Sequence, residues 1–114
     1  MVQEQLQSYF KGRVIYKDYT EQPNLLLSLT MGNETGVIEA HFFGRRAYFY
    51  YFMVERFDTV TVWGDPANYG IHGRSIELQE VAEAAAKLRF KAAEHNYREA
   101  EAEHSLYFSQ LRAG

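Results

Sequence analysis

The 114-residue sequence predicts a mainly β domain: a small five-stranded barrel, with a short helix between its third and fourth strands and a long helix after the fifth. Residues 12–79 predict the barrel, because they are rich in β-branched and aromatic residues and contain seven of the eight glycines and both prolines. Residues 80–112 contain neither and consist largely of Ala, Glu, Lys, Arg and Leu, the strongest helix formers. We therefore assign residues 1–79 to the barrel and residues 80–114 to a helical extension of the same domain.

Three segments before residue 44 have the composition and alternation of β-strands: Arg13–Lys17, Leu25–Thr30 and Gly36–Phe43. The second and third segments are joined by Gly32-Asn33-Glu34-Thr35-Gly36. Glycines on both sides of Asn33 permit the left-handed backbone conformations of a hairpin turn. These two strands are therefore expected to pair antiparallel.

Alternation along the third strand divides its side chains between the barrel interior and the outer surface. We expect its even-numbered residues inside, because the opposite choice would bury Glu39 and His41 without partners. The expected interior set, with two residues from the fourth strand, is Ile38, Ala40, Phe42, Val60 and Val62.

The remaining barrel elements follow Gly44. Arg45–Arg56 could be a strand by composition, but it is long and follows a glycine, so we expect a short helix. A fourth strand is expected over Thr59–Gly64, ended by Gly64-Asp65-Pro66, and a fifth over Gly73–Leu78 after a turn at residues 68–70.

The terminal helix should hold about 25 to 33 residues and reach about 40 to 50 Å, which exceeds the size of the barrel. One face carries a thin apolar stripe, which passes into polar residues: Val81, Ala85, Leu88 and Ala92, then His95 and Glu99. Only the first half is therefore expected to pack on the barrel. Apolar residues return in the far half, which we expect to pack on a second copy or on another protein: Tyr97, Leu106, Tyr107, Phe108 and Leu111.

The β-β-β-α-β-β order within about 70 residues is the element order of the OB-fold, a five-stranded Greek-key barrel. Residues 33–44, followed after about 15 residues by residues 60–66, resemble the signature of the nucleic-acid-binding OB-fold superfamily. That superfamily includes the wedge domain of branch-migrating DNA helicases and the small barrel at the end of replicative polymerase subunits. The resemblance covers about residues 11–80 and implies binding of nucleic acid. The chain departs from the family at Phe57-Asp58, where a Gly-Asp pair usually opens the fourth strand.

Single-strand binding combines aromatic side chains that stack on bases with cations that follow the phosphates. The candidate cations are Lys11, Arg13, Lys17, Arg45, Arg46 and Arg74. The candidate stacking residues are Tyr16, Tyr19, His41, Phe43, Trp63 and Tyr69. Arg13 and Lys17 are four residues apart, so a regular strand would place both on one face.

Each candidate also has a structural explanation. Phe43 and the aromatic residues of segment 48–52 could fill the bottom of the barrel, and Trp63 could lie beneath the terminal helix. Arg45-Arg46 could be a solvated turn. Residues 1–79 have a net charge of −2 and residues 80–114 one of −1, so binding would depend on a local cationic stripe and would weaken with salt.

Several other functions are disfavoured. Without cysteine there is no disulfide, no cysteine-ligated zinc and no thiol nucleophile. The four histidines lack metal-binding spacings, and His95 with Glu99 at i and i+4 is typical of a solvated helix face. No phosphate-binding loop or serine-nucleophile motif occurs. We therefore expect no catalytic residues, no metal and no cofactor.

Two readings of a different class stay open beside nucleic-acid binding. The chain could be an OB-like adaptor whose ligand is protein, with the long helix forming an oligomer or docking a partner. The first region could also be another small β-barrel with a small-molecule ligand. No apolar run approaches the roughly 20 residues that a membrane span needs, and the start does not resemble a secretory signal, so we expect a cytoplasmic protein.

Overall fold

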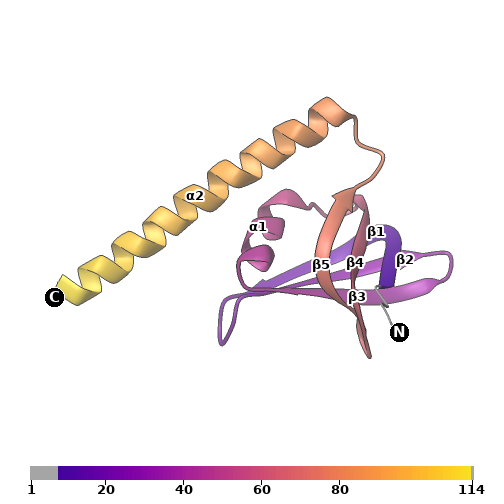
Figure 1. Cartoon of the computed structure of the whole chain (residues 1–114), viewed down its shortest axis with the longest axis horizontal. Helices are drawn as coiled ribbons and strands as arrows, with labels where there is room; N and C mark the ends of the chain where they lie inside the picture. The colour runs from indigo at the N-terminus through magenta and orange to yellow at the C-terminus, as the bar shows by residue number, and fades with distance from the viewer. Residues whose placement is uncertain (1–7, 114) are drawn as a thin grey trace, which may run out of the picture.

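The computed structural model describes residues 8–113, with side chains described for residues 8–103, and it confirms the expected fold class (Figure 1). The elements are β1 (Ser8–Thr20), β2 (Leu26–Asn33), β3 (Gly36–Phe43), α1 (Arg45–Met53), β4 (Thr59–Ala67), β5 (Gly70–Leu78) and α2 (Glu83–Ala113). The strands close into a barrel in the order β1-β2-β3-β5-β4, with β4 paired back to β1. β3 and β5 pair in parallel and the other neighbours pair antiparallel, which gives the Greek-key order of an OB-type barrel.

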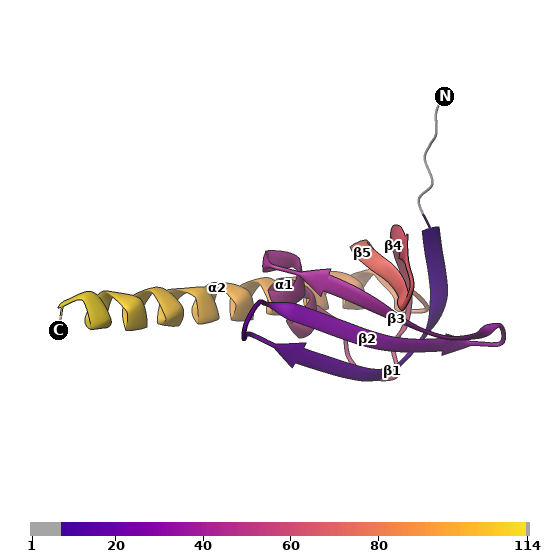
Figure 2. The same cartoon turned by 90° about the horizontal axis from the view of Figure 1, so that it is seen from below.

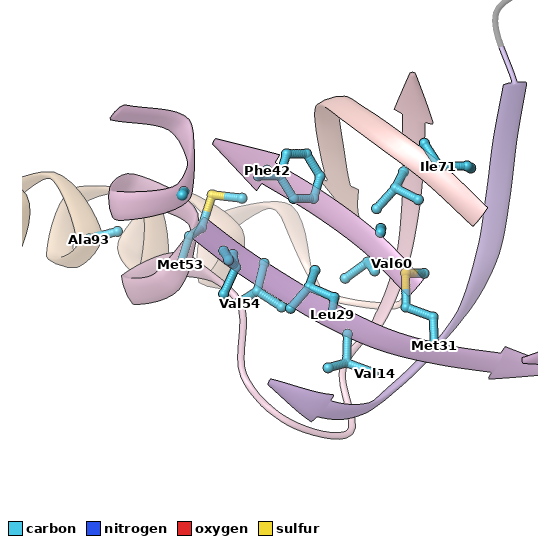
Figure 3. Packing of buried hydrophobic residues seen from close by; sticks show 13 residues of the cluster. Val14, Leu29, Met31, Phe42, Met53, Val54, Val60, Ile71 and Ala93 are labelled. Atoms are coloured by element: carbon cyan, nitrogen blue, oxygen red, sulfur yellow. The ribbon is translucent and has the colours of Figure 1, made fainter. Parts of the chain in front are cut away.

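The barrel interior contains the side chains that alternation predicted. Ala40, Phe42, Val60 and Val62 are fully buried, and Ile38 packs against them. Figure 3 shows Phe42 and Val60 pointing into the same interior from different strands. Residues of β1, β2, α1 and the following turn complete this core: Val14, Leu27, Leu29, Met31, Met53 and Val54. Glu39, His41 and Phe43 lie on the outer side of β3, as expected.

β1 is longer than expected and contains a bulge between Val14 and Tyr16. A bulge inserts one extra residue and so reverses which side of the sheet the later side chains face. Before the bulge Arg13 is exposed and its neighbour Val14 is fully buried, whereas after it Lys17 turns toward α1. The prediction that Arg13 and Lys17 share one face is therefore wrong.

β4 continues to Ala67, so the expectation that it ends at Gly64-Asp65-Pro66 is also wrong. Pro66 pairs with Ile71 of β5. The described pairing between β1 and β4 starts at Ser8 opposite Gly64, so among the described residues Pro66 has a strand neighbour on the β5 side alone. Proline is tolerated at such an edge because its missing N–H is not needed by a second strand.

The turn into β4 keeps a left-handed residue at the position where the resembled family has glycine. Phe57 has φ 77°, in the region that favours glycine, at a strain of roughly 1–2 kcal/mol. Two hydrogen bonds hold the turn against β1. The Phe57 N–H donates to the Val14 carbonyl at 2.7 Å, and the Val14 N–H donates to the Asp58 carbonyl at 2.8 Å. Phe57 thus has a backbone conformation that glycine adopts at less cost, and hydrogen bonds to β1 hold it there.

α2 lies against α1 and extends well past the barrel (Figures 1 and 2). The expected packing stripe is wrong, because Leu88 is 69% exposed and Ala85 and Ala92 are also exposed. The face that packs instead includes Ala86, Arg89, Phe90, Ala93 and Tyr97. The expectation that Tyr97 packs on a partner is wrong, because its ring packs on Tyr48 and Phe49 of α1. The expected contacts of Leu106, Tyr107, Phe108 and Leu111 lie outside the described side chains. No helix within residues 8–113 is long and apolar enough to cross a membrane.

Candidate nucleic-acid interface

Four ring side chains gather on the outer surface of β3 and β5 and on the turn between β4 and β5. His41 and Tyr69 stack with ring centroids 3.8 Å apart, and Phe43 and His72 stack at 5.2 Å. His41 and Phe43 meet edge to face at 6.4 Å, which joins the two pairs. We call these four residues the β3–β5 ring cluster. It unites three residues that the sequence predicted with His72, which the sequence analysis missed.

The parallel pairing of β3 and β5 positions this cluster. His41 lies opposite His72 in the register, and the Glu39 N–H donates to the Tyr69 carbonyl at 3.0 Å. Gly70 has φ 143°, and a Cβ there would lie 2.3 Å from the Glu39 carbonyl oxygen. Only glycine allows so close an approach in that conformation, and the approach brings Tyr69 onto His41.

The surface of the cluster is apolar at one end and charged at the other. Phe43 is 43% exposed, and Leu26 of β2 lies opposite it. At the other end, His41 Nε2 lies 2.8 Å from Glu39 Oε1. The side-chain hydroxyl of Ser28 donates to the same oxygen at 3.4 Å. The Glu39 carboxylate therefore borders the His41 end of the cluster.

Arg74 lies on β5, two residues after His72. Its guanidinium donates two hydrogen bonds to Asp65 Oδ2, at 2.8 and 3.1 Å. Both side chains are about half exposed or more, so this pair contributes at most about 1 kcal/mol. A phosphate could replace the Asp65 carboxylate at low cost.

Three other candidates lie on a separate surface formed by β1 and β4, which are the two strands not adjacent to β3. Lys11 and Arg13 are exposed, and Trp63 is half-buried opposite Tyr9. Tyr9 itself is 69% exposed, and the sequence analysis missed it. Tyr9, Lys11 and Arg13 line a groove of about 640 Å³ beside the β2–β3 turn. The structure thus places these three candidates on other strands than the ring cluster.

The Lys17 side chain binds the carboxyl end of α1 and does not lie on either candidate surface. Its Nζ donates to the carbonyl oxygens of Tyr51 and Val54, at 2.9 and 2.8 Å, where α1 ends. The ammonium group also lies 4.7 Å from the centre of the Tyr51 ring. Burial lowers the pKa of Lys17, and the charges of Glu55 and Asp58 oppose this shift. A cation at the carboxyl end of a helix stabilises its last carbonyl groups, so we remove Lys17 from the candidate interface.

The Tyr19 side chain likewise packs against α1. Its ring stacks on Tyr51 at 4.5 Å and on Tyr48 at 6.2 Å, and its hydroxyl donates to Glu21. Burial raises the pKa of Tyr19, and the Glu21 charge raises it further. Tyr16, at the bulge, is 55% exposed and lies outside the ring cluster.

Arg45 and Arg46 begin α1 and face α2. Arg45 lies 3.4 Å from Glu101 of α2, and its side chain is 83% exposed. Arg46 is exposed and forms no ion pair with any residue whose side chain the structure describes. Both arginines line an apolar groove between the two helices, which is separate from the ring cluster.

Comparison of the sequence with models of protein families, and with curated proteins, finds no match. Within the described part of the chain, no group of three His, Asp or Glu side chains is arranged to hold a metal ion. The candidate interface therefore depends on the geometry of the ring cluster itself.

Proposed function

We propose that this chain is a nucleic-acid-binding OB-fold module that binds single-stranded nucleic acid on the β3–β5 ring cluster. The observation that supports it is the two stacked ring pairs, His41 with Tyr69 and Phe43 with His72, on the outer surface of the barrel. OB-folds bind oligonucleotides on the face of strands 2 and 3 and at the loop between strands 4 and 5. Stacking on aromatic rings contributes about 1–3 kcal/mol per base and tolerates any sequence.

DNA is the preferred ligand in this proposal, because the resembled barrels belong to DNA helicases and replicative polymerases. The setting would be a cytoplasmic assembly for replication, repair or recombination. Arg74 would release the Asp65 carboxylate and bind a phosphate of the nucleic-acid backbone instead. Few cations and a nearby carboxylate, Glu39, make the expected affinity modest. Because the salt dependence scales with the number of phosphates neutralised, a single contact from Arg74 makes binding weaken only gradually as salt rises.

Single substitutions distinguish the two candidate surfaces. Binding of a labelled single strand is measured by fluorescence anisotropy for Phe43→Ala and Tyr69→Ala, which remove rings from the cluster. Loss of one stacking contact should weaken binding about tenfold in each variant. Tyr16→Ala removes an exposed tyrosine outside the cluster and should bind like the wild type.

The same assay tests the surface on β1 and β4 through Trp63→Ala and Arg13→Ala. We expect Trp63→Ala to weaken single-strand binding only slightly. Arg13→Ala should weaken it only by the contribution of a distant charge. Strong losses in these two variants, with normal binding by Phe43→Ala and Tyr69→Ala, would move the interface to that surface.

A second function, protein binding or self-association through α2, is supported by one observation. Within residues 83–103, α2 packs on α1 with one face, while Leu88 is 69% exposed on another. A contiguous exposed apolar patch is typical of interaction surfaces, and in this second function Leu88 belongs to such a patch. Light scattering of the full chain and of Leu88→Glu tests it: a dimer that becomes monomeric in the variant supports this function, and a monomer in both refutes self-association.

A further inference from the structure

An apolar groove of about 500 Å³ lies between α1, α2 and β5. Its lining comes from all three elements: Phe49, Tyr50, Met53, Ile76, Phe90 and Tyr97. Arg45 and Arg46 complete the lining and are its charged residues. The volume falls within the range of small-molecule binding sites, which are mostly apolar and carry a few polar groups that orient the ligand.

Contacts between rings hold the groove in shape. Phe49 of α1 packs on Phe90 of α2 at 5.3 Å and on Tyr97 at 6.0 Å. On the barrel side, Tyr50 meets the fully buried Phe42 edge to face at 5.0 Å. Ala93 is 1% exposed and points toward α1, near Met53, so the helices approach closely there (Figure 3). The groove is therefore formed before any ligand binds.

The two arginines favour an anionic head group. Arg46 is exposed and unpaired among the residues with described side chains. Arg45 bridges to Glu101 at 3.4 Å in an exposed pair of the kind that contributes little, so a ligand anion can replace that carboxylate. Guanidinium groups bind carboxylates with paired, charge-assisted hydrogen bonds.

The apolar lining favours an acyl chain over a nucleobase. A base carries polar edges that need hydrogen-bond partners when they are buried. Apart from the arginines, the groove offers two phenol hydroxyls, and that of Tyr97 already donates to Glu101 at 3.0 Å. An acyl chain has no polar edge, and every buried methylene improves affinity about fourfold.

The geometry points to a second binding site: the groove between α1 and α2 binds a medium-chain carboxylate. The chain lies along Phe49, Met53 and Phe90, and the carboxylate is held by Arg45 and Arg46. This site is independent of the nucleic-acid interface and of the proposed function.

Isothermal titration of the full chain with octanoate, decanoate and dodecanoate, each below its micelle concentration, tests the site. We expect one ligand per chain and a Kd that falls about fourfold for each added methylene until the groove is filled. Decanol has the same chain without the charge and should bind at least about tenfold more weakly than decanoate.

Three variants test the assignment of the residues. Arg46→Met keeps an apolar stem of similar length, and it should reduce the preference for decanoate over decanol while leaving decanol binding unchanged. Phe90→Ala should weaken both ligands. Val37→Ala removes an exposed apolar side chain on β3, outside the groove lining; it is the control and should bind like the wild type. Thermal unfolding of each variant verifies that the fold is intact.

Absence of saturable binding would overturn the proposal. Binding of several ligand molecules per chain, with equal affinity for decanoate and for decanol, would also overturn it. Such binding is typical of nonspecific apolar association. An unchanged preference in Arg46→Met would refute the role given to the arginine.

Discussion

Replacing Lys17 with methionine should destabilise the fold through the carboxyl end of α1. Methionine keeps an unbranched apolar stem but cannot donate a hydrogen bond. In the wild type, Nζ lies 2.9 Å from the Tyr51 carbonyl oxygen and 2.8 Å from that of Val54. The substitution therefore leaves two part-buried carbonyl groups without their donor.

The magnitude follows from two opposing effects. A hydrogen bond from a charged donor contributes about 1.5–3 kcal/mol to stability. Burial of the ammonium group offsets part of this, as the lowered pKa of Lys17 indicates, and water can reach part of the exposed carbonyl surface. We expect a net loss of about 2 kcal/mol in the free energy of unfolding, or about 8 °C in Tm for a chain of this size.

Urea unfolding followed by circular dichroism measures this loss. Lys11→Met is the control, because Lys11 is an exposed cation on the same strand and its removal should change stability by less than about 0.5 kcal/mol. Equal unfolding midpoints for the two variants would refute the reasoning and return the Lys17 charge to the candidate interface.

Stability should fall above about pH 10, because burial raises the pKa of Tyr19 above its ordinary value of 10.0. A raised pKa in the folded state gives stability that is complete below the ordinary pKa and is lost as the pH rises above it. Tyr19→Phe should make the decline in urea midpoint between about pH 9 and 11 shallower, and an equally steep decline would contradict this. Arg89→Met removes the ion pair with the mostly buried Asp58. It should cost about 1–2 kcal/mol and accelerate hydrogen exchange in the first turns of α2, whereas unchanged exchange would show that other contacts hold the helix. Gly73→Ala would place a Cβ 2.4 Å from the ring of Phe42, and calorimetry should show a loss of about 1–3 kcal/mol unless the ring can move aside.

The barrel could be predicted because its strand signals are local. Alternation along β3 was enough to separate buried Ala40 and Phe42 from outward His41. β1 shows the limit of such reasoning. Its bulge turns Lys17 from the outer surface toward α1, and nothing in the composition around Ile15 marks that extra residue.

The ring cluster and the helix contact could be predicted only in part, because both depend on long-range packing. His41 and Phe43 follow from alternation, but the contact of His72 depends on the parallel register between β3 and β5. On α2, alanines occur on several faces, so the apolar pattern selects none of them strongly. The rings of α1 decide the contact face through Phe90 and Tyr97, which leaves Leu88 exposed.

Binding of a fluorescently labelled single strand of about 20 nucleotides tests the central proposal most directly. Anisotropy is recorded with the full chain at low and moderate salt, beside a duplex of the same sequence. The account predicts saturable binding that prefers the single strand and weakens as salt rises. Absence of binding at low salt, or equal binding of the duplex, would contradict it.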